Sequence, residues 1–104
     1  MQVQVHAYSS VKGNSILTQT IEESVENAVR RWTPRITRVE VHLSDINGQK
    51  GGAADKRCLL EARIGGLQPL AVTHQAATLH DAVDGAAEKL KKVLQNTIGK
   101  LNDR

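Results

Sequence analysis

Aromatic residues and cysteines are scarce in this chain of 104 residues, which has one Trp, one Tyr, no Phe and one Cys. Proteins that hold single-stranded nucleic acids by base stacking need several exposed rings, so the sequence argues against that mode of recognition. Because Cys58 is the only cysteine, an internal disulfide and a multi-cysteine zinc site are both excluded. A lone thiol is consistent with a reducing compartment.

Long apolar runs are also missing. No stretch approaches the roughly 18 residues that a membrane-spanning helix needs, and residues 1–8 alternate polar and apolar side chains instead of forming a signal peptide. We therefore expect a soluble cytoplasmic protein with no membrane contact. A length of 104 residues predicts a single domain over residues 1–104. The net charge of +3 permits an anionic partner without requiring one.

Hydrophobic periodicity predicts four strands and two helices. Val3, Val5 and Ala7 alternate with polar residues as in a half-buried strand. Pro34 is expected to end the first helix by moving Thr33 out of helical geometry. In chain order, the predicted elements are a strand near 2–7, a helix at about 18–32, strands at about 36–44, 56–64 and 70–74, and a helix at about 78–101.

The order β-α-β-β-β-α predicts how these elements pack. Short connections between the last three strands favour an antiparallel meander, although the glycine-rich loop at 45–54 is the longest of them. Each strand alternates, so one sheet face is expected to be wet and the other covered by both helices. The predicted fold class is an α/β two-layer sandwich (α+β), with two helices packed on one face of a four-stranded sheet.

The second helix is the element that organises the chain. Its apolar stripe includes Leu79, Val83, Leu90 and Leu94, and Thr78 is a suitable N-cap. Its polar face carries the cations Lys89, Lys91, Lys92 and Lys100. A rigid row of ammonium groups suits the closely spaced phosphates of RNA. The alternative is an ordinary solvated helix face, in which Glu88 pairs with Lys92 at i,i+4 spacing.

Arginines form a second set of candidate RNA contacts. Guanidinium groups match phosphate geometry in a bidentate way, although residues at the end of the first helix can equally interact with its dipole, as Glu22, Glu23 and Glu26 would at its start. On the third strand, an even separation places two further arginines on the outer sheet face, where Glu40 or Glu61 are possible partners. The candidate arginines are Arg30, Arg31, Arg35, Arg38, Arg57 and Arg63.

No catalytic or metal site is predicted. Cys58 and the histidines at positions 6, 42, 74 and 80 match no known ligand spacing. Cys58 belongs to the inward set of its strand and His42 to the outward set of the neighbouring strand, so they should face apart. The loop at 45–54 lacks the phosphate-binding pattern that precedes a helix. We therefore expect neither an enzyme nor a cofactor.

Three stretches, 39–45, 55–63 and 79–90, together resemble the ribosome hibernation-promoting factor family, also called ribosome-associated inhibitor A or sigma-factor modulation protein. The most recognisable part is Ala82-Val83-Asp84 followed by Lys89-Leu90. The resemblance implies the same β-α-β-β-β-α fold and a stress factor that binds the small ribosomal subunit between head and body. Such factors occupy the mRNA and tRNA channel, inhibit translation and contact rRNA phosphates through basic side chains.

Long members of the family carry a C-terminal dimerisation domain. This chain is expected to lack that domain and to be a monomer. The alternative function is a small protein-interaction or regulatory module on the same fold that does not bind RNA. The modest charge excess favours this alternative, and the family pattern favours the ribosome.

Overall fold

The computed structural model describes residues 1–7, 15–46 and 55–102, with the side chains of Leu101 and Asn102 left aside. The predicted loop at 45–54 therefore lies largely outside the described residues. In chain order the elements are β1 (Gln2–His6), α2 (Ser15–Val29), the 3-10 helix η1 (Arg30–Arg35), β2 (Ile36–Asp45), β3 (Lys56–Ile64), β4 (Leu70–Ala76) and α3 (Leu79–Asn102).

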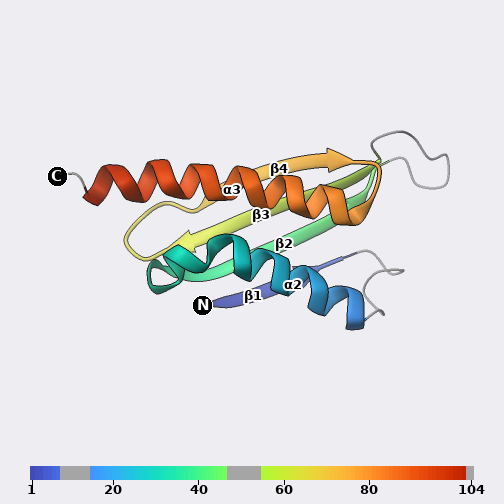
Figure 1. The fold of residues 1–104 in the computed structure, drawn as a ribbon, viewed down its shortest axis with the longest axis horizontal. Coiled ribbons are helices and arrows are strands. Elements are labelled where there is room, and N and C mark those ends of the chain that lie inside the picture. The colour runs from blue at the N-terminus through green and yellow to red at the C-terminus, as the bar shows by residue number, and fades with distance from the viewer. Residues whose placement is uncertain (8–14, 47–54, 103–104) are drawn as a thin grey trace.

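The four strands form one sheet in the order β1-β2-β3-β4. The β2–β3 and β3–β4 pairs are antiparallel, which confirms the predicted meander. β1 and β2 are parallel and are connected through α2. Both helices lie across the same face of the sheet (Figure 1). The α+β sandwich predicted from the sequence is confirmed.

A hydrophobic cluster fills the space between the sheet and the helices. Val41 on β2, Leu60 on β3 and Leu90 on α3 have no exposed surface. Their spacing explains this burial, since alternate residues of a strand and every third or fourth residue of a helix share one face. Trp32 is only 7% exposed and closes the cluster beside the end of α2.

The start of α3 forms as predicted. The backbone N–H of Asp81 donates to Thr78 Oγ1 at 3.1 Å, and the N–H of Ala82 donates to the Thr78 carbonyl at 3.0 Å. The hydroxyl thus satisfies one of the free N–H groups of the first turn. The helix continues through Gly99 and reaches Asn102.

The first helix differs from its prediction at both ends. It begins at Ser15 because Leu17 extends the apolar stripe of Ile21 and Val25 by one turn and packs against the core. The glutamates expected early therefore lie beyond the first turn, which holds no acidic residue. We expected acidic residues in the first turn and basic residues in the last turn, where each interacts favourably with the helix dipole. This prediction is wrong for α2, whose first and last turns hold neither.

Pro34 does not end the helical segment as predicted. The α-helix ends at Val29, and Arg30–Arg35 continue as a 3-10 helix that includes Thr33 and Pro34. The φ angle of proline is fixed near that of helical residues. A short 3-10 segment contains few backbone hydrogen bonds, so the missing N–H of Pro34 costs little. Thr33 Oγ1 donates to the Arg30 carbonyl at 2.9 Å, and the N–H of Ile36 donates to the Thr33 carbonyl.

Two strands are slightly longer than predicted. β2 includes Asp45, which pairs with Lys56, and β4 extends to Ala76, which also pairs with Lys56. Lys56 Nζ donates to Asp45 Oδ2 at 2.9 Å and to Asp55 Oδ2 at 3.2 Å.

Among the described residues, no helix is long and apolar enough to cross a membrane.

The ion cluster at Lys56 predicts an alkaline dependence of stability. The hydrogen bond to Asp45 is the largest influence on the ammonium and raises the pKa of Lys56 above 10.5. Its contribution to the free energy of unfolding is therefore complete below about pH 10.5 and is lost as the pH rises through the higher folded-state pKa. Denaturant titrations should show the stability difference between wild type and Lys56→Met shrinking over that range. A difference that stays constant up to about pH 12 would contradict this.

Gly85 gives a second prediction, because a Cβ atom there would overlap the ring of His74 on β4. Gly85→Ala gains up to about 1 kcal/mol of helix propensity but forces the ring to move, at about 1–3 kcal/mol. We expect the single variant to be destabilised by about 1 kcal/mol in chemical denaturation. In a His74→Ala background, the same substitution should stabilise the protein. Equal effects in both backgrounds would show that the ring does not limit this position.

Cys58 gives a third prediction. The residue has no exposed surface, and burial raises the pKa of its thiol to about 12. Since the thiolate is the reactive form, native Cys58 should react with a thiol reagent far more slowly than denatured Cys58. Absorbance-monitored labelling in buffer and in denaturant tests this. Rapid stoichiometric labelling of the native protein would contradict a buried, unreactive thiol.

Candidate nucleic-acid interface

Half of the ten predicted cations gather around one open groove between η1 and the C-terminal part of α3. The groove consists of two adjoining depressions that share Arg31, Trp32 and Gln95 as lining residues. Arg30 and Lys91 line one of them, and Pro34 and Ile98 lie in the other. The cations that line the groove, called here the groove cations, are Arg30, Arg31, Arg35, Lys91 and Lys100.

The 3-10 helix is what brings the arginines to this groove. Buried Trp32 anchors the segment in the core, while the arginines at both sides of it stay exposed. The guanidinium carbon of Arg31 lies 5.8 Å from the centroid of the Trp32 ring, within the range of a cation–π contact. Arg30 Nη2 donates a hydrogen bond to Asn27 Oδ1. Both arginines are thus positioned locally and keep much of their surface open.

Among the residues that the structure describes, the groove cations have no carboxylate partner. Within residues 1–7, 15–46 and 55–102, none of the five forms an ion pair with a carboxylate. Their positive potential is therefore available to an anion that enters the groove. Several cations around a concave surface focus the field on a polyanion better than the same charges scattered over a convex surface.

The predicted lysine row of α3 is divided by the structure. Lys89 Nζ donates to the backbone carbonyl of Thr73 on β4 at 2.9 Å, so it lies along the β4 side of the helix. Lys91 lies on the side that faces the groove. Lys92 is exposed, and the Glu88–Lys92 pair considered from the sequence is not among the ion pairs of the described residues.

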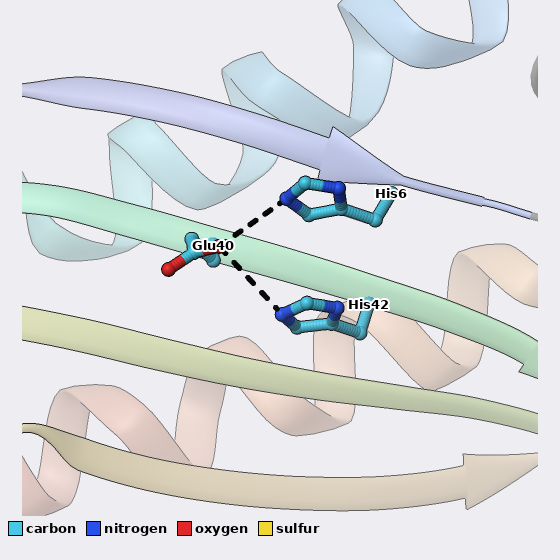
Figure 2. A group of neighbouring side chains, drawn as sticks. All are labelled: His6, Glu40 and His42. Carbon is cyan, nitrogen blue, oxygen red and sulfur yellow. Dashed lines mark ion pairs between the residues drawn. The ribbon is translucent and has the colours of Figure 1, made fainter.

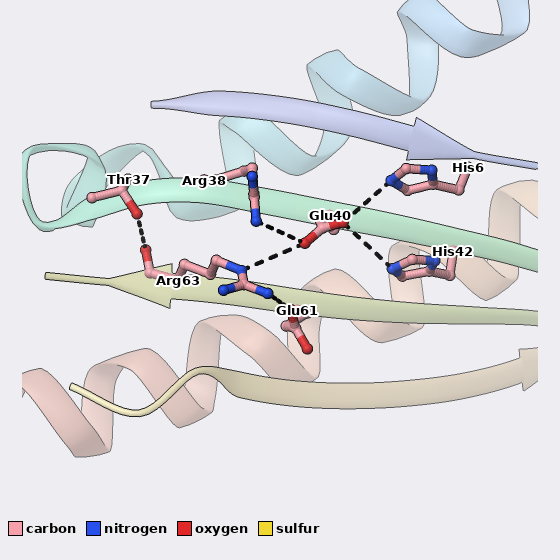
Figure 3. A network of polar contacts seen from close by, with 7 residues as sticks. All are labelled: His6, Thr37, Arg38, Glu40, His42, Glu61 and Arg63. Atoms are coloured by element: carbon pink, nitrogen blue, oxygen red, sulfur yellow. Dashed lines mark hydrogen bonds and ion pairs between the residues drawn. The ribbon is translucent and has the colours of Figure 1, made fainter.

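The remaining candidates, Arg38, Arg57 and Arg63, lie on β2 and β3. Arg63 Nη2 is 3.2 Å from Glu61 Oε1 on the same strand, and its Nε pairs with Glu40 on β2, which confirms the cross-strand pairing that was the alternative to an RNA contact. Arg38 Nη2 and Arg63 Nε lie 3.2 Å and 3.5 Å from Glu40 Oε2 (Figure 3). Arg57 is exposed and has no carboxylate partner among the described residues.

Glu40 stands at the centre of this network and also faces two histidines. His6 Nε2 lies 3.3 Å and His42 Nε2 lies 4.0 Å from Glu40 Oε1 (Figure 2). Burial is the largest single influence on the carboxyl and opposes its ionisation. Arg38, Arg63, His42 and the hydrogen bond from His6 together outweigh it, so the pKa of Glu40 lies below its ordinary value of 4.5.

Sequence reasoning missed this grouping of His6, Glu40 and His42. His42 does face away from Cys58, as predicted, because Cys58 is buried in the core and His42 is exposed. The parallel register of β1 with β2 places His6 opposite His42. No pattern in the sequence indicates this register, so the grouping could not be predicted.

The fold is shared with two solved structures. A ribosomal subunit interface protein from Coxiella burnetii aligns with 95% of this chain and 99% of its own, at a TM-score of 0.77 and 13% identity. The N-terminal domain of Protein Y from Thermus thermophilus aligns with 91% of this chain and 93% of its own, at a TM-score of 0.65 and 16% identity. At such identities the likeness establishes the fold.

No relative of the chain was found among curated proteins. A family model described as sigma 54 modulation protein / S30EA ribosomal protein matches residues 10–102, nearly the whole chain and both of its helices. The chain therefore belongs to the sigma 54 modulation protein / S30EA ribosomal protein family.

Proposed function

We propose that this protein is a ribosome hibernation factor that docks on rRNA phosphates of the small subunit and occludes the mRNA and tRNA channel. The observation that carries the proposal is the family match over residues 10–102. The Coxiella burnetii neighbour, described as a ribosomal subunit interface protein, is consistent with it. A ribosomal partner implies a cytoplasmic location, a role in stress and translational control, and no catalytic step.

The groove cations are the residues that we assign to the rRNA. Five positive side chains surround one concavity without carboxylate partners in the described part of the chain. A phosphate that enters the groove releases counterions, and it breaks no ion pair of the residues that the structure describes. Lys92 is exposed on α3 and precedes the groove residues Gln95 and Asn96 by three and four positions, so it lies on the same side of the helix and adds a further charge there.

The sheet-face arginines and Lys89 contribute less in this proposal. Arg38 and Arg63 are engaged with Glu40 and Glu61, and Lys89 donates to Thr73. A phosphate would have to compete with these contacts. Arg57 is exposed and unpaired among the described residues, yet it lies on the opposite face from the groove. Arg57 therefore provides a matched control for groove substitutions.

Lys91→Glu and Arg57→Glu change the net charge by the same amount on opposite faces. Lys91→Glu should weaken binding to purified small subunits by about tenfold, equivalent to about 1.4 kcal/mol, and reduce the slope of affinity against salt by about 1. Arg57→Glu should leave both quantities close to wild type. Cosedimentation across a salt series measures them, and the two folds can be compared by circular dichroism.

Two outcomes would decide against the proposal. Equal losses in Lys91→Glu and Arg57→Glu would mean that binding follows net charge and that the groove is not the contact surface. Wild-type protein that shows no salt-sensitive association with small subunits would remove the ribosome itself as the partner. A protein-interaction module without RNA binding would then describe the chain better.

A further inference from the structure

Three side chains with metal-binding atoms converge on the outer sheet face, opposite the helices. His6 is the last residue of β1, and the parallel register pairs it with His42 on β2. Glu40 precedes His42 by two residues and therefore points to the same face. One ligand atom from each of His6, Glu40 and His42 lies within 4.8 Å of the other two.

The geometry resembles a ligand set more than a simple ion pair. The two imidazole rings are stacked with centroids 4.7 Å apart and planes 11° from parallel. Both turn Nε2 toward the same carboxylate oxygen, at 3.3 Å from His6 and 4.0 Å from His42 (Figure 2). A hydrogen bond to Glu40 orients His6, and stacking on the His6 ring holds His42 beside it, with Nε2 just beyond hydrogen-bond distance of the carboxylate.

The separations of the ligand atoms can be compared with those around a small cation, since all three atoms lie within 4.8 Å of one another. Bonds of 2.0–2.2 Å at a tetrahedral angle place neighbouring ligand atoms about 3.3 Å apart. His6 Nε2 and Glu40 Oε1 already have this separation. His42 Nε2 lies less than 1 Å further from the carboxylate, and a modest rotation of its exposed ring closes that gap.

Neighbouring residues hold the carboxylate in the required orientation. Arg38 and Arg63 contact Glu40 through Oε2, which leaves Oε1 directed at the two imidazoles (Figure 3). Such outer contacts commonly fix a ligand in a metal site. The guanidinium charges also repel a cation, so the expected affinity is lower than that of a buried site with the same ligands.

We propose that His6, Glu40 and His42 form a surface site for a divalent late first-row transition metal ion, with Zn²⁺ as its reference ligand. Two imidazoles and one carboxylate select ions of this class over Mg²⁺ and Ca²⁺, which prefer all-oxygen sets. Water or an external donor completes the coordination, because the side chains of His6 and His42 are 51% and 46% exposed. The proposal is independent of ribosome binding.

The test uses untagged full-length protein that has been stripped of metal with a chelator. Isothermal titration calorimetry with Zn²⁺ should give one site per chain, and Co²⁺ should develop visible absorption bands from nitrogen and oxygen ligation. Mg²⁺ should produce no comparable heat. Zn²⁺ should also raise the midpoint of thermal unfolding, since an ion that binds the folded state stabilises it.

Variants separate this site from adventitious binding. His6→Ala and His42→Ala should each weaken Zn²⁺ binding by about tenfold or more, because loss of an outer partner of a ligand already costs about that much in metal affinity. His80→Ala is the matched control, because His80 lies near two carboxylates, Asp81 and Asp84, on α3 but belongs to no group of three metal-binding side chains in the described part of the chain. It should bind Zn²⁺ like wild type.

Two results would overturn the site. One is Zn²⁺ affinity in the His6→Ala/His42→Ala double variant equal to that of wild type. The other is an equal loss in His80→Ala. Circular dichroism establishes that the variants are folded. If His42→Ala folds poorly, the chemical shifts of the His6 and His42 ring protons in wild type on addition of Zn²⁺ serve instead, and unchanged shifts would refute the proposal.

Discussion

The alternation of side chains along β2 is the constraint on which the rest of the structure depends. β2 pairs with β1 on one side and β3 on the other. One face of β2 therefore joins the hydrophobic core, and its other face joins the polar network of the outer sheet surface. Val39 and Val41 have no exposed surface, while Glu40 between them holds the polar network of the opposite face. A register slip of one residue would bury Glu40 beneath the helices and expose both valines. Core packing and outer-face chemistry are therefore specified by the same strand.

The sequence predicted those parts of the fold that depend on local period. The stripe of α3, the alternation in β2 and β3 and the N-cap at Thr78 all formed as expected, because each is a property of neighbouring residues. The end of the first helix was predicted wrongly for a physical reason. A proline disfavours an α-helical residue before it, but burial of Trp32 stabilises a 3-10 continuation through Pro34. Tertiary packing here overrides a local rule.

The sequence predicted which basic residues could contact RNA, but it did not predict which of them lie together on one surface. Pattern alone assigned Arg57 and Arg63 to the outer sheet face and named glutamates as possible partners. It did not bring Lys91 to the arginines of η1, because that proximity depends on how α2 packs against α3. The His6–His42 pair was missed for a similar reason. Two strands connected through a helix have a register that no short-range pattern fixes, whereas a tight hairpin would have set it through its turn.

The two faces of the molecule differ in how their positive charges are compensated. On the helix side, the groove cations have no carboxylate partners among the described residues, so an approaching polyanion meets their uncompensated charge. On the sheet side, Glu40 forms ion pairs with Arg38 and Arg63 through one oxygen, and its second oxygen is directed at two imidazoles. Phosphate binding there would require these contacts to break, while metal binding would leave them in place. A polyanion on the helix side and a cation on the sheet side would therefore use different side chains, and neither would have to displace the contacts of the other.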